Sequence, residues 1–119
     1  MRLRFPWMRD ELLGYLNQLA NPRLVPPGES NPVPLDYAVH FLFDDTVLAD
    51  DPRMAIGDFI ATNEEAEAVG RVVSILDHVL SVHGTHHPDE YYLQQPEWGA
   101  VLSAARGAID CLLRADRAT

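Results

Sequence analysis

Apolar side chains recur at intervals of three and four residues in four separate stretches of this 119-residue chain. This spacing places them on one face of an α-helix, where they can be buried against other helices. The stretches cover about residues 6–20, 35–44, 62–83 and 96–115. Apolar and polar residues hardly ever alternate in the way that predicts strands. The sequence therefore predicts an all-α fold, a single-domain bundle of four main helices plus short helical turns.

Residues typical of helix ends support these boundaries. Pro6 suits the first turn of a helix, where its missing N–H costs nothing. Thr62 and Glu65 have the spacing of a capping box, in which each side chain accepts a hydrogen bond from an otherwise unpaired backbone N–H. Gly84 is a typical helix stop because glycine readily adopts a positive φ.

Two connections separate the predicted helices. Residues 22–34 hold five of the nine prolines and are predicted to form an extended Pro-rich connection. Residues 84–95 form a connector that carries histidines, with a turn of helix predicted at 88–92. A further short helical element is predicted over 52–60. Because the composition suits one ordinary globular unit, residues 1–119 are interpreted as a single helical domain.

The charge balance narrows the classes of partner. Eighteen acidic against nine basic residues give a net charge of −9. Nucleic acids and anionic membrane surfaces both require positive charge, so neither is an expected partner. Asp10 and Glu11 interrupt the apolar residues near the N-terminus, which argues against a signal peptide, and no run approaches the length of a membrane span. The one cysteine, Cys111, excludes an intrachain disulfide, so we expect a cytoplasmic protein.

Most of the negative charge lies between residues 44 and 67. Eight acidic residues and one arginine in this stretch account for −7 of the −9. The carboxylates that we predict to meet a partner are Asp44, Asp45, Asp50, Asp51, Asp58, Glu64 and Glu65. The first hypothesis is a non-enzymatic interaction module that binds a basic protein, with an immunity- or antitoxin-like role as one form of it. The alternative is that these carboxylates cap helix N-termini and keep the protein soluble.

Four of the five histidines lie within ten residues, between positions 78 and 87. Imidazole and carboxylate groups together can bind a divalent metal such as zinc. The candidate metal ligands are His83, His86 and His87, with Asp89 or Glu90. The second hypothesis is therefore a metal-binding protein or a metal-dependent hydrolase. Against it, histidines at the end of a helix are also favoured by the negative end of the helix dipole.

No catalytic residue can be assigned from a motif. The chain lacks a nucleophile elbow, a P-loop and a dinucleotide fingerprint. Cys111 falls near the end of the last helix, where the dipole disfavours a thiolate. A non-enzymatic role is therefore favoured, with the metal-dependent hydrolase kept as the alternative. The last helix also carries an apolar stripe that runs from Trp98 to Leu113 and an opposite face of small residues that includes Gly99, Ser103, Gly107, Ala108 and Cys111. This small-residue face is either plain surface or a close helix contact, within the bundle or in a homodimer.

Several short strings together resemble a known family. They are Leu42-Phe43-Asp44-Asp45-Thr46, Ala55-Ile56-Gly57-Asp58-Phe59, Asp89-Glu90-Tyr91, Pro96-Glu97-Trp98 and the glutamate-rich start of the third helix. This combination is similar to a family of small, acidic, uncharacterised bacterial proteins, found mainly in actinobacteria, over about residues 35–113. The resemblance implies a helical fold and a cytoplasmic bacterial setting, and it supplies no catalytic residues. The histidine cluster is not part of the family pattern.

Overall fold

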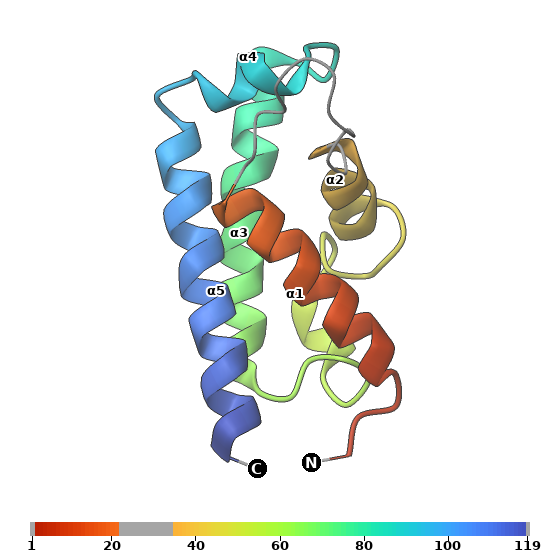
Figure 1. The fold of residues 1–119 in the computed structure, drawn as a ribbon. Coiled ribbons are helices and arrows are strands. Elements are labelled where there is room, and N and C mark those ends of the chain that lie inside the picture. Colours follow the sequence, from red (N-terminus) through yellow and green to blue (C-terminus); the bar gives the residue numbers. More distant parts are fainter. Residues whose placement is uncertain (1, 22–34, 119) are drawn as a thin grey trace, which may run out of the picture.

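The computed structural model describes residues 2–21 and 35–118 (Figure 1). Its elements are α1 (Pro6–Ala20), α2 (Leu35–Phe43), η1 (a 3-10 turn, Pro52–Ala55), α3 (Asn63–His83), α4 (Asp89–Leu93) and α5 (Trp98–Ala118). Over these two ranges the chain forms no strand, although Ile56 and Ile60 share one isolated bridge. The all-α prediction is confirmed. The Pro-rich connection at 22–34 lies outside the described residues.

The predicted caps form, with small shifts in position. Thr62 Oγ1 accepts a hydrogen bond from the backbone N–H of Glu65 at 3.1 Å. Glu65 Oε1 accepts from the N–H of Ala61 at 2.8 Å, one residue earlier than in a standard capping box. Gly84 ends α3 with φ of +83°, a conformation that a side chain would strain. The element predicted over 52–60 is helical only at Pro52–Ala55.

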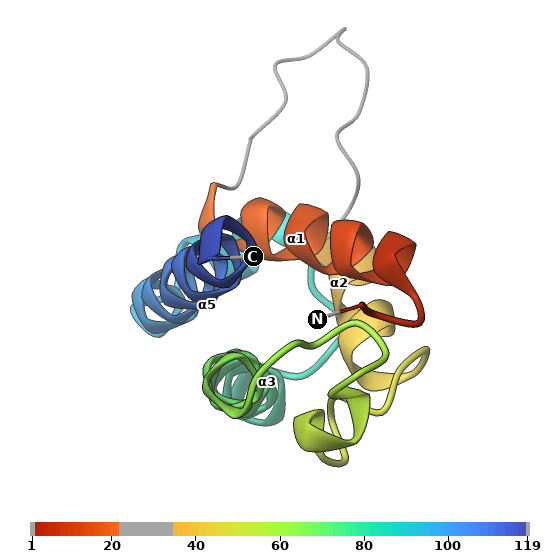
Figure 2. The same ribbon diagram turned by 90° about the horizontal axis from the view of Figure 1, so that it is seen from below.

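The two longest helices, α3 and α5, lie side by side and antiparallel, and α1 crosses them (Figures 1 and 2). Helix α2 packs against α1, and η1 packs against α3. The short helix α4 links the end of α3 to the start of α5 (Figure 1). The side chain of Arg9, near the start of α1, reaches Leu112 and Asp116 near the end of α5 in a buried polar cluster.

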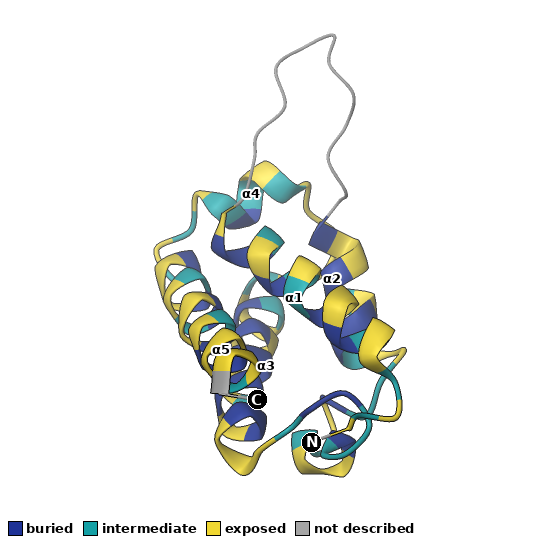
Figure 3. Cartoon of the chain, turned by 60° about the horizontal axis from the view of Figure 1, so that its bottom comes forward, coloured by how far each residue is buried: buried dark blue, intermediate teal, exposed yellow. Residues whose placement is uncertain are grey.

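Each of the four long helices turns its apolar face inward (Figure 3). The largest fully buried apolar side chains are Leu12, Leu16, Leu19, Leu42, Leu48, Ile60, Val69, Val72, Leu76, Val79 and Leu112. Within the described part of the chain, no helix combines the length and the apolar character that a membrane crossing needs.

The buried face of α5 differs from the predicted one. The prediction placed Leu113 on the apolar stripe and assigned Ala108 and Cys111 to the opposite, small-residue face. Leu113 is 43% exposed, so its assignment to the buried stripe was wrong. Ala108 and Cys111 are buried, so this part of the small-residue face is a contact within the bundle, which is one of the alternatives given for it. The reason is that α5 packs against both α1 and α3, and small side chains let helix backbones approach closely.

Candidate functional site

The acidic stretch begins with a loop that joins α2 to η1. Asp44, Asp45 and Asp50 are exposed on this loop. The loop is anchored by Leu48, whose side chain is fully buried, and by Thr46 Oγ1, which donates to the Phe41 carbonyl at 2.9 Å. The loop thus presents three carboxylates on an ordered frame, because its apolar anchor cannot leave the core without cost.

This loop forms one side of a groove of about 360 Å³, with α3 as the opposite wall. The groove is lined by Phe43, Leu48, Ala49, Pro52, Gly70, Val73, Ser74 and Asp77. A Cβ added at Gly70 would lie 3.4 Å from Cγ of Pro52, so α3 passes close to η1 at this part of the wall. The groove therefore has apolar and small residues inside it, and Asp77 adds a carboxylate from α3.

One arginine offsets part of the negative charge near the groove. Arg53 donates from Nε to Asp51 Oδ1 and from Nη2 to Asp51 Oδ2, both at 3.1 Å. These hydrogen bonds lower the pKa of Asp51. Asp51 is therefore already paired, whereas Asp44, Asp45 and Asp50 are exposed on the loop and Asp77 is exposed on α3.

The remaining predicted acidic residues lie apart from this loop. Asp58 is half-buried; its carbonyl accepts from Phe5 N–H at 2.7 Å, and its carboxylate lies 3.6 Å from Arg4 Nε. Glu64 is exposed in the first turn of α3, where the helix dipole favours a negative charge. The structure therefore groups three of the seven predicted carboxylates, Asp44, Asp45 and Asp50, beside the groove.

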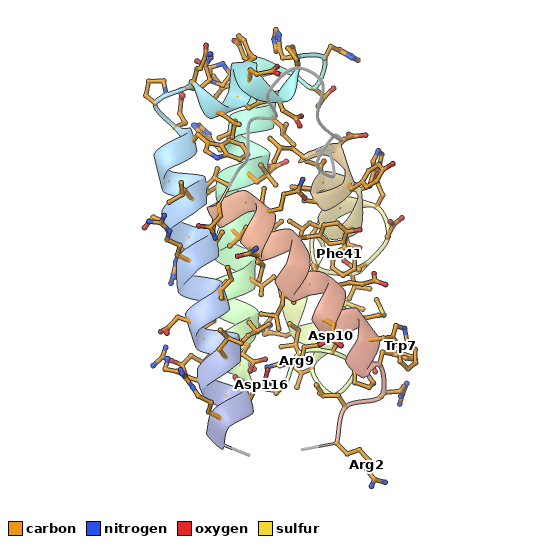
Figure 4. All side chains as sticks on the ribbon, in the orientation of Figure 1. Arg2, Trp7, Arg9, Asp10, Phe41 and Asp116 are labelled. Atoms are coloured by element: carbon orange, nitrogen blue, oxygen red, sulfur yellow. The ribbon has the colours of Figure 1, made fainter. Side chains whose placement is uncertain are left out.

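Glu65 is a correction to the predicted partner-binding set. Its side chain is fully buried and forms a two-pronged ion pair with Arg9 of α1, at 2.8 and 2.9 Å. Arg9 is only 5% exposed, and it also donates to the carbonyls of Phe59 and Leu112 and to the carboxylate of Asp116. Arg9 and Asp116 face each other between α1 and α5 (Figure 4). Arg9 therefore links α1 to Glu65 of α3 and to Leu112 and Asp116 of α5, and Glu65 is not available to a partner.

Sequence reasoning missed Arg9, although a signal for it exists. Arg9 precedes Leu12, Leu16 and Leu19 at spacings of three, four and three, so it continues the buried stripe of α1. Glu65 precedes Val69 at a spacing of four in the same way on α3. A charged residue on the buried stripe is expected to pair with an opposite charge, because an unpaired buried charge is very costly.

His40 lies in the last turn of α2, next to the acidic loop. Its Nδ1 lies 2.6 Å from Asp44 Oδ2, and its Nε2 lies 3.2 Å from Asp36 Oδ2. The hydrogen bond with Asp44, together with the charge of Asp36, raises the pKa of His40. Protonated His40 thus compensates the charges of Asp36 and Asp44. Asp44 lies just past the end of α2, where the helix dipole makes a negative charge unfavourable.

The raised pKa of His40 predicts a pH dependence of stability. A group whose pKa is higher in the folded than in the unfolded state stabilises the fold fully below its unfolded pKa. That stabilisation is lost as the pH rises through the folded pKa. The pH window of this loss therefore begins at about pH 6.5 and extends upward. We expect the difference in melting temperature between the wild type and His40→Gln to shrink across this window in thermal scans by circular dichroism. A constant difference would contradict the pairing.

The three histidines predicted as metal ligands have separate environments. His83 is directed at Tyr91, with Nδ1 3.2 Å from the phenol oxygen, and at Glu97, with Nε2 3.3 Å from Oε2. His87 stacks on the Tyr91 ring at 3.8 Å, and His86 is exposed. Across residues 2–21 and 35–118, no group of three His, Cys, Asp or Glu side chains is placed to hold a metal ion. The metal site stays a prediction.

Through its polar contacts, His83 connects the end of α3 to α4 and to the residues just before α5. The pKa of Glu97 is lowered, first by a hydrogen bond from its own backbone N–H and then by His83. Tyr92 is buried, and its hydroxyl donates to the Gly84 carbonyl at 2.6 Å. These contacts position α4 between the two long helices, which is a structural role for residues that the sequence suggested for metal binding.

The small-residue face of α5 is only partly exposed. Gly99, Ser103 and Gly107 face solvent. A Cβ added at Gly99 or Gly107 would meet nothing within 4 Å, so packing within the described chain does not require glycine there. The homodimer through this face stays a prediction.

Comparison with known proteins gives one match. A family model described as a domain of unknown function, DUF7945, matches residues 3–119. No curated protein and no solved structure matches the chain. The match agrees with the resemblance to an uncharacterised family, and it extends to nearly every residue, including the helix with Arg9. The chain therefore belongs to the DUF7945 family of domains of unknown function.

Proposed function

We propose that this protein is a non-enzymatic interaction module whose acidic groove binds a cationic segment of a partner protein. The groove is the 360 Å³ hollow between the 44–51 loop and α3, together with the exposed carboxylates of Asp44, Asp45, Asp50 and Asp77. A segment with arginine or lysine beside apolar side chains would match both features. Its apolar groups would enter the groove, and its charges would meet the carboxylates.

The position of Asp45 is the observation that carries this proposal. Asp45 follows the C-terminus of α2, where the helix dipole makes a negative charge unfavourable. Helix capping accounts for Asp51, whose side chain accepts from Arg53 N–H at the start of η1, and for Glu64 in the first turn of α3. The neighbouring Asp44 pairs with His40. Neither capping nor this pair accounts for Asp45, so a role outside the fold explains it better.

The absence of an assigned nucleophile fits a binding role. Cys111 is buried, and burial raises the pKa of its thiol, which makes it a poor nucleophile at neutral pH. An immunity- or antitoxin-like protein of the bacterial cytoplasm is the biological form that we propose. Such a protein would use the concentrated negative charge to attract a basic partner rapidly, and salt would weaken the attraction.

The test is a calorimetric titration with a short synthetic peptide that carries arginines on one helical face and leucines on the other. Asp45→Asn/Asp50→Asn removes two charges at the groove. Because an exposed ion pair contributes about 0.2–1 kcal/mol, we expect about fivefold weaker binding at low salt. The matched control is Asp10→Asn/Glu11→Gln, which removes two exposed charges on α1 and should leave the affinity nearly unchanged.

Two results would contradict the proposal. One is equal weakening by the groove variant and the α1 variant, since the peptide would then respond only to net charge. The other is no measurable binding by the wild type at low salt. Loss of binding at high salt, with the groove variant weaker than the α1 variant at every salt concentration, supports the proposal.

A further inference from the structure

A second hollow lies beside α4, among α2, α3, α4 and α5. Its volume is about 70 Å³. A buried water needs about 10–15 Å³ on this scale, so the space suits a small organic molecule. Its apolar lining comes from Leu35 and Val39 of α2 and from Leu76 and Leu80 of α3. Water held against such a surface gains little, and an apolar group would replace it favourably.

Two aromatic rings also line this hollow. Trp98 is 5% exposed and Tyr92 is 7% exposed, so both rings are fixed within the structure. The Tyr92 hydroxyl donates its hydrogen bond to the Gly84 carbonyl, so a ligand in the hollow meets the Tyr92 ring. Aromatic rings of this kind attract cations through the negative potential over their faces, and tryptophan does so most strongly.

Both charged side chains that line the hollow, within the described residues, are acidic. Asp89 is half-buried at the start of α4, and its Oδ2 accepts from the N–H of Leu35 at 3.2 Å. Asp36 is exposed in the first turn of α2, and its Oδ2 lies 3.2 Å from Nε2 of His40. His87 is the other ionisable group at the opening. These two carboxylates repel an anion and attract a cation.

We propose that this hollow is a binding site for a small organic cation of the alkylammonium class. The ammonium group lies between the carboxylates of Asp36 and Asp89 and the aromatic rings, and the apolar body enters the space lined by Leu76 and Leu80 of α3. The site is separate from the acidic groove, because the two hollows share no lining residue. It does not depend on the interaction function proposed above.

The first test is a fluorescence titration with isobutylammonium chloride. Trp7 and Trp98 are the two tryptophans, and Trp7 is 58% exposed on α1. Trp7→Phe therefore leaves Trp98 as the single reporter. We expect a saturable change with isobutylammonium, and about fivefold weaker binding of isobutanol, which has the same shape without the charge. Equal binding of both compounds, or no saturation by isobutylammonium, would overturn the proposal.

The second test uses Asp89→Asn in the Trp7→Phe background. Asparagine can still accept the hydrogen bond from Leu35, so the start of α2 is kept while the charge is removed. We expect about threefold weaker binding of isobutylammonium and unchanged binding of isobutanol. The matched control is Asp45→Asn, which removes an exposed charge at the other hollow. The same loss in both variants would show a general charge effect and would overturn the assigned site.

Discussion

Arg9→Ala is expected to lower the free energy of unfolding by about 3–5 kcal/mol, because it leaves the buried carboxylate of Glu65 without its partner. The carbonyls of Phe59 and Leu112 also lose a donor. Urea denaturation, followed by circular dichroism, measures this change. The control is Arg71→Ala, which removes an exposed arginine from α3 and should change stability by less than about 0.5 kcal/mol.

The double variant Arg9→Ala/Glu65→Ala sharpens this prediction. Removing both partners eliminates the unpaired buried charge, so the loss should be clearly smaller than the sum of the two single losses. Backbone groups at Ala61, Phe59 and Leu112 still lose their partners, so the double variant should stay less stable than the wild type. Additive losses would contradict a direct pairing of Arg9 with Glu65.

Leu112→Ala is the second substitution with a large expected effect. Leu112 is fully buried on α5, and truncating a buried leucine costs about 2–5 kcal/mol through lost burial and the cavity that remains. Leu113 is the next residue in the same helix and is 43% exposed, so Leu113→Ala makes the same chemical change at an exposed position. We expect its cost to be below about 1 kcal/mol in the same urea experiment. Similar losses in the two variants would contradict the orientation of α5.

The helices could be predicted because their signals are local. The stripe of leucines in α1, the cap at Thr62 and the stop at Gly84 each depend on residues within a few positions of one another. The buried face of α5 could not be predicted in the same way. It depends on which helices approach α5 and how closely, and that is set by residues far away in the chain. Small residues made this choice ambiguous, since Ala108 is compatible with either face.

The candidate site was predicted in part. The clustering of charge on the 44–51 loop follows from its sequence, and the structure exposes Asp44, Asp45 and Asp50 there. The burial of Glu65 could have been predicted from its place on the stripe, but its partner Arg9 is 56 residues away, and no local pattern links the two. The two hollows have walls from several helices, so no single stretch of sequence indicates them.

Binding in the groove is tested most directly by a chemical-shift map of the ¹⁵N-labelled full chain with the arginine-leucine peptide. We expect the largest backbone shifts in two segments that meet only in the folded protein, 43–52 and 70–77. Raising the salt concentration should reduce these shifts together. Shifts spread evenly over exposed carboxylates, including those of Asp10 and Glu11 on α1, would contradict binding in the groove.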